Sequence, residues 1–362
     1  MPKNDLPKIV GFNVRQILAP LDKPHKTASG TIEVAPLALL DVQTNAGISG
    51  SSYVFTYTPM ALKPVALLIG EMEQLLLEKP LEPTELSSFL AAKFRLLGNQ
   101  GLVAIAISAI DMALWDALAK FANLPLANLL GAAAKPIRIY DSLGQMSANE
   151  TAEQVEISLK NGFDAFKIKA GHSDPKTDVE VVRAIKNIAG PDTWIAVDFN
   201  QAFSASEAIL RMRLLDEENL AWIEEPVRSE DFEGHSFVRS SISTPVQTGE
   251  NWWGIPDMNK SIAADASDFV MPDAMKIGGV SGWIKAAALA EANGLPLSSH
   301  LFGEISAHLL AASPTAHMLE WMDIAGSINT TPPIISNGKI TAADIAGSGL
   351  NWDEKALKQY LV

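Results

Sequence analysis

Three segments in the middle of this 362-residue chain each end in an acidic residue: WIAVD (194–198), LAWIE (220–224) and PVQTGE (245–250). The acidic residues Asp198, Glu224 and Glu250 are evenly spaced, since 224 − 198 and 250 − 224 both equal 26. Each segment is short and apolar, like a buried strand, and 26 residues hold one strand, one helix and two loops. This repeat predicts parallel strands whose carboxyl ends meet at one mouth of an α/β barrel.

The alternation of strand and helix continues on both sides of these segments. We expect strands at 137–143, 165–170, 193–200, 220–226, 244–250, 268–274, 295–301 and 316–321. Apolar residues with helical spacing lie between them, at 149–161, 175–189, 204–216, 231–240, 255–264, 279–292 and 304–312. Eight strands with seven helices between them predict an α/β fold, a (β/α)7β modified TIM barrel over residues 132–322.

Residues 1–131 do not follow the 26-residue repeat. Strands are expected at 8–18, 31–43 and 51–57, and helices at 64–77, 83–97 and 102–121. A polar, proline-containing loop is expected at 20–30. Strands followed by helices predict a separate N-terminal α+β domain. Residues 323–362, with a helix at 353–361, are expected to pack back on that domain.

The composition is that of a globular protein with a large core, at 48% hydrophobic and 19% charged residues. A net charge of −14 argues against nucleic acid or an anionic membrane as a partner. Cysteine is absent, which fits a reducing cytoplasm, and the first residues have no signal-peptide pattern. The most apolar segment, 102–134, is interrupted by Asp111, Asp116 and Lys120, so we expect a buried helix and not a membrane span. We therefore expect a soluble, cytoplasmic protein.

Three carboxylates at one barrel mouth repel each other unless a cation lies between them. Oxygen ligands without cysteine or histidine favour a hard cation, so the sequence predicts Mg²⁺, with Mn²⁺ as the second choice. A metal at the mouth of a barrel predicts catalysis.

Other ionisable residues end the neighbouring strands. Lys167 and Lys169 are two residues apart, so both point to the same face. Two ammonium groups beside a metal are expected to lower each other's pKa, which lets one act as a base near pH 7. His300 ends one strand and Asp273 ends the strand before it, and a carboxylate beside an imidazole raises its basicity. A solvated lysine pair and a structural histidine are the alternatives, and the neighbouring carboxylates disfavour them.

Seven motifs, in this order and spacing, resemble the mandelate racemase subgroup of the enolase superfamily: FKIK (166–169), VDFN (197–200), WIEEP (222–226), GENW (249–252), MPDAMKIGG (271–279), SSHLF (298–302) and AHMLE (316–320). Each motif is weak alone, but together they are specific, and the resemblance covers almost the whole chain. It implies that the N-terminal domain caps the barrel mouth, that the substrate is a small carboxylate, and that the protein is a homo-oligomer, an octamer.

The resemblance also implies a role for each matching residue. One Mg²⁺ would be held by Asp198, Glu224 and Glu250. Glu225 would lie just outside these ligands. Lys169 would take or return the α-proton on one face of the substrate, and His300, supported by Asp273, would do so on the other. Bases on opposite faces permit racemisation.

Further residues would hold the substrate. Lys167, Ser142 and a protonated Glu320 would bind the substrate carboxylate, and Asn200 would contact the region of the α-hydroxyl. Removing the α-proton places extra negative charge on the carboxylate, which the cation and these donors would stabilise. Lys276 resembles the opposing base of the muconate-cycloisomerase and dipeptide-epimerase subgroup. Because those enzymes lack the Asp–His pair and the final glutamate, we interpret Lys276 as a supporting or structural residue.

Substrate specificity is expected to come from a lid at 20–32 and from Tyr57 on a second loop. His25 and Ser29 stand where the resemblance leads us to expect valine-like residues, and Leu143 replaces an expected polar residue. An apolar wall would come from Ile32, Leu301 and Met322. The lid is compatible with an aryl substrate or with a more polar 2-hydroxy acid.

The expected function is a Mg²⁺-dependent racemase of a 2-hydroxy carboxylate, mandelate or a close aryl analogue, acting through an enediolate intermediate. The alternative is an acid-sugar dehydratase with the same metal site, in which His300 assists departure of the β-hydroxyl. A barrel kept only for binding would typically have lost a ligand or a base, and this chain has lost neither.

Overall fold

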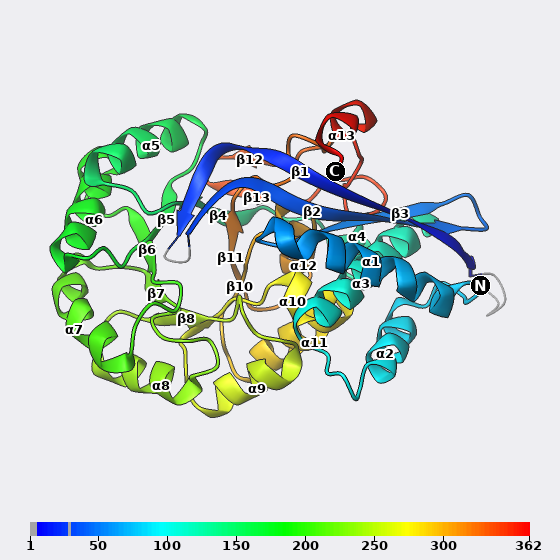
Figure 1. The fold of residues 1–362 in the computed structure, drawn as a ribbon. Helices are drawn as coiled ribbons and strands as arrows, with labels where there is room; N and C mark the ends of the chain where they lie inside the picture. The colour runs from blue at the N-terminus through cyan, green and yellow to red at the C-terminus, as the bar shows by residue number, and fades with distance from the viewer. Residues whose placement is uncertain (1–5, 28–29) are drawn as a thin grey trace.

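The computed structural model describes residues 6–27 and 30–362, which form an α+β domain beside a barrel (Figure 1). The first domain begins with an antiparallel sheet in the order β1 (Ile9–Thr27), β2 (Gly30–Thr44) and β3 (Ser49–Phe55). Four helices follow: α1 (Pro59–Leu76), α2 (Pro83–Lys93), α3 (Gly101–Phe121) and α4 (Leu126–Leu129). Strands followed by helices confirm the predicted α+β domain.

The expected loop at 20–30 is instead a continuation of β1 and β2. Pro20 pairs with Val34, and His25 pairs with Ile32 after an irregularity. The prediction of a loop was wrong because a two-stranded ribbon satisfies the backbone N–H and C=O groups that a long loop would leave unpaired. Ser29 lies outside the described residues.

Two of the first three helices differ from the predicted ranges. Helix α1 begins at Pro59, not at residue 64, because the Thr58 side chain caps its first turn and accepts a hydrogen bond from the N–H of Met60. Pro64 lies inside this helix. Helix α2 ends at Lys93, four residues early. Helix α3 is long and apolar enough to cross a membrane, but 83% of its most apolar window is buried inside the molecule, as in a core helix.

Eight parallel strands form the barrel: β4 (Ile137–Leu143), β5 (Ala165–Lys169), β6 (Trp194–Asp198), β7 (Trp222–Glu224), β8 (Val246–Thr248), β9 (Phe269–Val270), β10 (Leu297–Ser299) and β11 (Ala316–Trp321). Each strand pairs with the next along the chain, and β11 pairs with β4 to close the barrel. The predicted α/β barrel with its capping domain is therefore confirmed.

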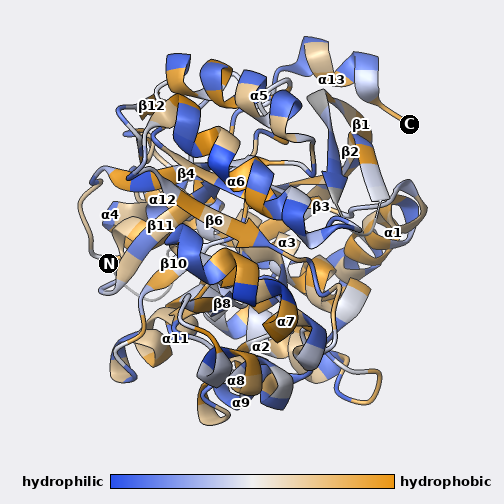
Figure 2. Cartoon of the chain, turned by 90° about the vertical axis from the view of Figure 1, so that its left-hand side faces the viewer, coloured by the Kyte–Doolittle hydropathy of each residue, from blue (hydrophilic) through white to orange (hydrophobic). Residues whose placement is uncertain are grey.

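Helices cover the outside of the barrel (Figure 1). They are α5 (Ala148–Lys160), α6 (Pro175–Ala189), α7 (Ala205–Leu215), the short η1 (Asp216–Glu218), α8 (Phe232–Ser241), α9 (Ile255–Ala263), the short α10 (Ala274–Ile277), α11 (Gly279–Ala292) and α12 (Gly303–Ala311). Strand β6 is largely apolar, whereas helices such as α6 carry polar and apolar residues on different faces (Figure 2). This pattern places the core between the strands and the inner faces of the helices.

The C-terminal segment contacts both domains. The hairpin of β12 (Ile334–Ser336) and β13 (Lys339–Thr341) pairs with the first residues of β4. Helix α13 (Glu354–Tyr360) lies on the capping domain, where Arg15 pairs with Glu354 at 2.8 Å. The expectation of packing on the first domain alone thus missed the contact with the barrel. We keep 1–131, 132–322 and 323–362 as proposed domain boundaries.

Candidate active site

Three buried carboxylates lie together at the carboxyl ends of the barrel strands. Asp198 ends β6 and pairs in register with Glu224, which ends β7, while Glu250 follows β8. One oxygen of each lies within 4.8 Å of the others. Among the described residues, Oε2 of Glu250 has no hydrogen-bond partner although it is buried. A set of three oxygen donors with an unsatisfied buried oxygen fits a hard divalent cation.

Two lysines of β5 reach these carboxylates. Lys167 Nζ lies 2.6 Å from Glu224 Oε1 and 2.6 Å from Glu320 Oε1, and Lys169 Nζ lies 2.5 Å from Asp198 Oδ2. Both side chains are buried.

The expected lowering of the lysine pKa values beside a metal stays a prediction, and the carboxylates around the two lysines act against it. Burial lowers the pKa of Lys167, but Glu224 and Glu320 outweigh it and raise the pKa well above its ordinary value. Burial and Lys167 lower the pKa of Lys169, but Asp198, assisted by other carboxylates, raises it overall. The prediction counted the positive charges of the neighbouring lysine and of the metal, and it left out the carboxylates. A bound divalent cation adds positive charge and acts in the opposite direction.

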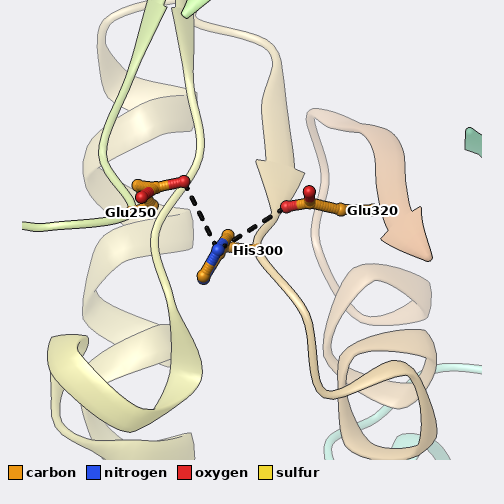
Figure 3. A group of neighbouring side chains, drawn as sticks. All are labelled: Glu250, His300 and Glu320. Carbon is orange, nitrogen blue, oxygen red and sulfur yellow. Dashed lines mark ion pairs between the residues drawn. The ribbon is translucent and has the colours of Figure 1, made fainter. Parts of the chain in front are cut away.

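His300 and Asp273 form the expected pair. His300 Nδ1 lies 2.5 Å from Asp273 Oδ2, and Asp273 also accepts a hydrogen bond from the N–H of Met275. The Nε2 atom of His300 faces Glu250 Oε2 at 3.3 Å and Glu320 Oε2 at 3.7 Å (Figure 3). Burial lowers the pKa of His300, but the carboxylates of Glu250, Glu320 and Asp273 raise it overall. Asp273 thereby orients a ring whose other nitrogen points into the site.

Glu320 ends β11 on the opposite side of His300 from Glu250 (Figure 3). It accepts a hydrogen bond from Ser142 Oγ at 2.6 Å and forms an ion pair with Lys167. Burial raises the pKa of Glu320, but Lys167 and His300 outweigh it and lower the pKa to about 2. Lys167 and His300 stabilise the carboxylate in this arrangement, so a protonated Glu320 stays a prediction for the site with a cation and a substrate carboxylate bound.

A cavity of about 540 Å³ opens between the barrel mouth and the capping domain. The predicted residues that line it are Lys169, Ser142, Asn200, Glu250, His300, Glu320, His25, Ile32, Tyr57, Leu301 and Met322. Lys167 is fully buried behind Glu320. Leu143 lines a neighbouring cavity of about 450 Å³, together with Asp141, and not this one.

The capping domain closes one side of the cavity. The backbone N–H of Gln145 donates to the carbonyl of Lys26 at 2.9 Å, which attaches the β1–β2 ribbon to the loop after β4. Burial, assisted by the positive charge of Lys169, lowers the pKa of His25 to about 3. His25 therefore presents a neutral imidazole to the cavity at neutral pH.

Sequence reasoning missed two supporting residues. Asn251 Nδ2 donates to Glu225 Oε2 at 2.7 Å and to Glu250 Oε1 at 3.1 Å, and its Oδ1 accepts from Lys276 Nζ at 2.5 Å. Trp222 Nε1 donates to Glu224 Oε2 at 3.2 Å. Both had a sequence signal: Asn251 directly follows Glu250, and Trp222 is two residues before Glu224, on the same face of the strand.

The backbone is unusual around the cavity. Among the described residues, eleven that are not glycine have positive φ, and six of them lie at the site or next to it: Tyr57, Asn200, Gln201, Glu225, Leu301 and Phe302. Such conformations cost energy in non-glycine residues and cluster at functional sites. The strain supports a functional role for this end of the barrel.

A capped α/β barrel with a buried carboxylate triad defines a class of metal-dependent enzymes that act on carboxylates. Residues 150–356, more than half of the chain, match the family model described as "Enolase C-terminal domain-like". Residues 10–131 match the model "Mandelate racemase / muconate lactonizing enzyme, N-terminal domain". The chain therefore belongs to the enolase superfamily, in the mandelate racemase / muconate lactonizing enzyme family.

Three relatives illustrate the range of this family. An enolase from Bradyrhizobium, solved with magnesium and mandelic acid, is 43% identical with a TM-score of 0.96, and the match covers 99% of each chain. A racemase from Streptomyces coelicolor A3(2) with bound magnesium is 26% identical with a TM-score of 0.92, covering 98% of this chain and 100% of that one. The L-talarate/galactarate dehydratase of Salmonella typhimurium is 34% identical over 72% of this chain and 66% of its own length.

Proposed function

We propose that this protein is a racemase that removes and returns the α-proton of a 2-hydroxy carboxylate, mandelate or a close aryl analogue. The observation that carries the proposal is that two potential bases line one cavity. Lys169 approaches from β5 and His300 from β10, and each is held by its own carboxylate, Asp198 and Asp273. A single base suffices to exchange a proton, whereas inversion needs a second one on the other face.

Mg²⁺ is the cofactor, and Asp198, Glu224 and Glu250 would hold it. The Bradyrhizobium and Streptomyces relatives bind magnesium, and the buried oxygen triad fits the same cation. When bound, the cation supplies positive charge that stabilises the negative charge left on the substrate carboxylate.

The protein's own residues would bind the substrate and move its α-proton. Lys167 and Ser142 already contact Glu320 at 2.6 Å, and these three would bind the substrate carboxylate, with Glu320 taking up a proton so that it can donate a hydrogen bond. Asn200, which donates to Asp198, would contact the α-hydroxyl. Lys169 and His300 would each accept or return the α-proton on one face. The capping domain would exclude water from the cavity.

The cavity wall supports an aryl substrate. Phe55, Ile32, Leu301 and Met322 give it an apolar side, and a relative that is 43% identical was solved with mandelic acid. Apolar and aromatic side chains are suited to burying a phenyl ring.

The test is proton NMR of the purified protein with Mg²⁺ in D₂O, given each mandelate enantiomer separately. We expect loss of the α-proton signal from both enantiomers together with decay of optical rotation. Exchange from one enantiomer without racemisation would mean that only one base works on this substrate and would contradict the proposal. Absence of exchange with either enantiomer would exclude mandelate.

The second candidate is dehydration of an acid sugar. Polar His25 and Lys276 also line the cavity, and the Salmonella relative is a dehydratase of talarate and galactarate. In that reaction His300 would donate a proton to the departing β-hydroxyl. Formation of a 2-keto acid from a panel of acid sugars, without racemisation of mandelate, would favour this function. Cytoplasmic location and an octameric assembly stay predictions.

A further inference from the structure

The capping domain also contacts the barrel directly after His300. Tyr53 and Phe55 are two residues apart at the end of β3 and share one face, and Tyr57 follows the strand with its ring 4.7 Å from that of Phe55. Phe55 and Tyr57 line the cavity, but Tyr53 reaches α12, where its hydroxyl donates to Glu304 Oε2 at 2.8 Å. Both side chains of this pair are buried. A hydrogen bond thus joins the capping domain to the first turn of the helix that follows His300.

The turn between His300 and α12 has a strained backbone. Leu301 has φ 49° and Phe302 has φ 51°, both left-handed. Such conformations persist only where the surrounding structure holds them. On the barrel side, Ser306 Oγ donates to the carbonyl of Leu301 at 2.8 Å. On the capping side, the ring of Tyr53 lies 5.2 Å from that of Phe302. The turn is therefore held from both domains.

We propose that Tyr53 and Glu304 are positioning residues for His300, through which the capping domain sets the alignment of this base. Their hydrogen bond holds the first turn of α12 in place. The first turn of α12 in turn holds the strained residues Leu301 and Phe302, which directly follow His300. Lys169 stands on β5 and is held by Asp198, away from this contact. Loss of the Tyr53 hydroxyl should therefore displace His300 and leave Lys169 in position. The kinetic readout of this inference rests on the proposed racemase function.

The first test uses the full-length Tyr53→Phe variant with Mg²⁺ and each mandelate enantiomer in D₂O. Inversion needs both bases, whereas Lys169 alone can exchange the α-proton with retention, because its ammonium carries three protons that mix with solvent. For the enantiomer whose α-proton faces Lys169, we expect inversion to fall about 10-fold, since small misplacements of reacting groups have large effects, and exchange with retention to stay within about 2-fold. For the other enantiomer, whose α-proton faces His300, exchange and inversion should fall together. A parallel fall of both rates for the enantiomer that faces Lys169 would overturn the proposal.

Matched variants separate positioning from general loosening of the domain interface. Ser281→Ala removes another hydrogen bond between the domains, the one that Trp115 Nε1 donates to Ser281 Oγ at 2.9 Å. It should leave the ratio of exchange to inversion unchanged. Glu304→Gln keeps an oxygen acceptor for Tyr53, so it should retain more inversion than Glu304→Leu. An equal change of the ratio in Ser281→Ala and Tyr53→Phe would contradict the proposal.

A second measurement does not depend on the substrate. Crystal structures of the wild type and of Tyr53→Phe should differ at the turn, with altered φ at Leu301 or Phe302 and a looser His300–Asp273 pair. An unchanged turn and an unchanged His300 in the variant would overturn the positioning role, even if the protein turns out to act on another carboxylate. Failure of the proposed function appears separately, as a wild type that does not racemise mandelate.

Discussion

The two ends of the barrel are built from the same strands but differ in charge and in packing. At the carboxyl ends, charged side chains are buried together and some oxygens lack hydrogen-bond partners within the described chain. Towards the amino ends, an aromatic cluster closes the barrel: Tyr140, Trp194, Trp222, Phe269 and His317. The carboxyl end contains the ionisable residues of the site, whose burial lowers stability, and the amino end stabilises the barrel through aromatic packing.

Two histidines show the contrast most directly. His300, at the mouth, has its pKa raised by Glu250, Glu320 and Asp273 against the effect of burial. His317, at the other end, stacks on Phe269 at a ring separation of 5.0 Å, and burial lowers its pKa to about 4. The surroundings thus raise the pKa of the histidine at the mouth and lower the pKa of the histidine at the other end.

The largest expected effect is at the mouth, for Glu224→Gln. Removing one carboxylate of the triad weakens Mg²⁺ binding and should lower kcat/KM by roughly 10²- to 10³-fold, the scale for losing one group that stabilises charge in the transition state. The melting temperature without Mg²⁺ should change little, because the lost repulsion among the three carboxylates offsets the lost ion pair with Lys167, which keeps Glu320 as a partner. Turnover assays and thermal melts measure the two quantities. Retained activity with a lowered melting temperature would mean that Glu224 is structural.

At the aromatic end, Phe269→Ala should do the reverse. Loss of the ring removes contacts with Trp222 and His317 and should cost about 2 kcal/mol of unfolding free energy, less than for a fully buried phenylalanine because Phe269 is only partly buried. Activity per folded molecule should be unchanged. Urea unfolding and initial rates at low temperature test this. A lowered kcat with unchanged stability would show that the two ends are not independent.

The smallest effect concerns pH and His317→Gln. The unfolded histidine binds a proton near pH 6.5 and the folded ring only near pH 4, so the wild type loses stability as pH falls between these values. The glutamine variant has no such loss. The difference in melting temperature, wild type minus variant, should therefore fall by a few degrees from pH 7 to pH 4.5. A pH-independent difference would show that folding leaves the pKa of His317 unshifted and would contradict the prediction.

The fold followed from the sequence where local signals were strong. The ranges 175–189 and 279–292 match α6 and α11, because Asp174 caps α6, Gly190 ends it and Gly278 precedes α11. The signal was weaker where tertiary pairing decides. The expected strand at 268–274 shrinks to Phe269–Val270, since Ala274–Ile277 turns into α10. The lid ribbon depends likewise on pairing between His25 and Ile32.

For the site, the sequence supplied the residue types and their strand ends, because the period of a strand and the 26-residue repeat are local properties of the chain. It could not supply the charge states. The pKa of Glu320 depends on Lys167 and His300, which are distant in sequence, and the same holds for Lys169 beside Asp198.

The sequence by itself therefore determined the barrel, the separate N-terminal α+β domain and the set of ionisable residues at the barrel mouth, since these follow from hydrophobic periodicity and spacing. The tertiary structure decided which carboxylate neutralises which lysine and how the ribbon covers the cavity. It also decided that Tyr53 meets Glu304 across 251 residues of chain. Electrostatic and packing energies depend on distance in space, which the order of residues alone does not give.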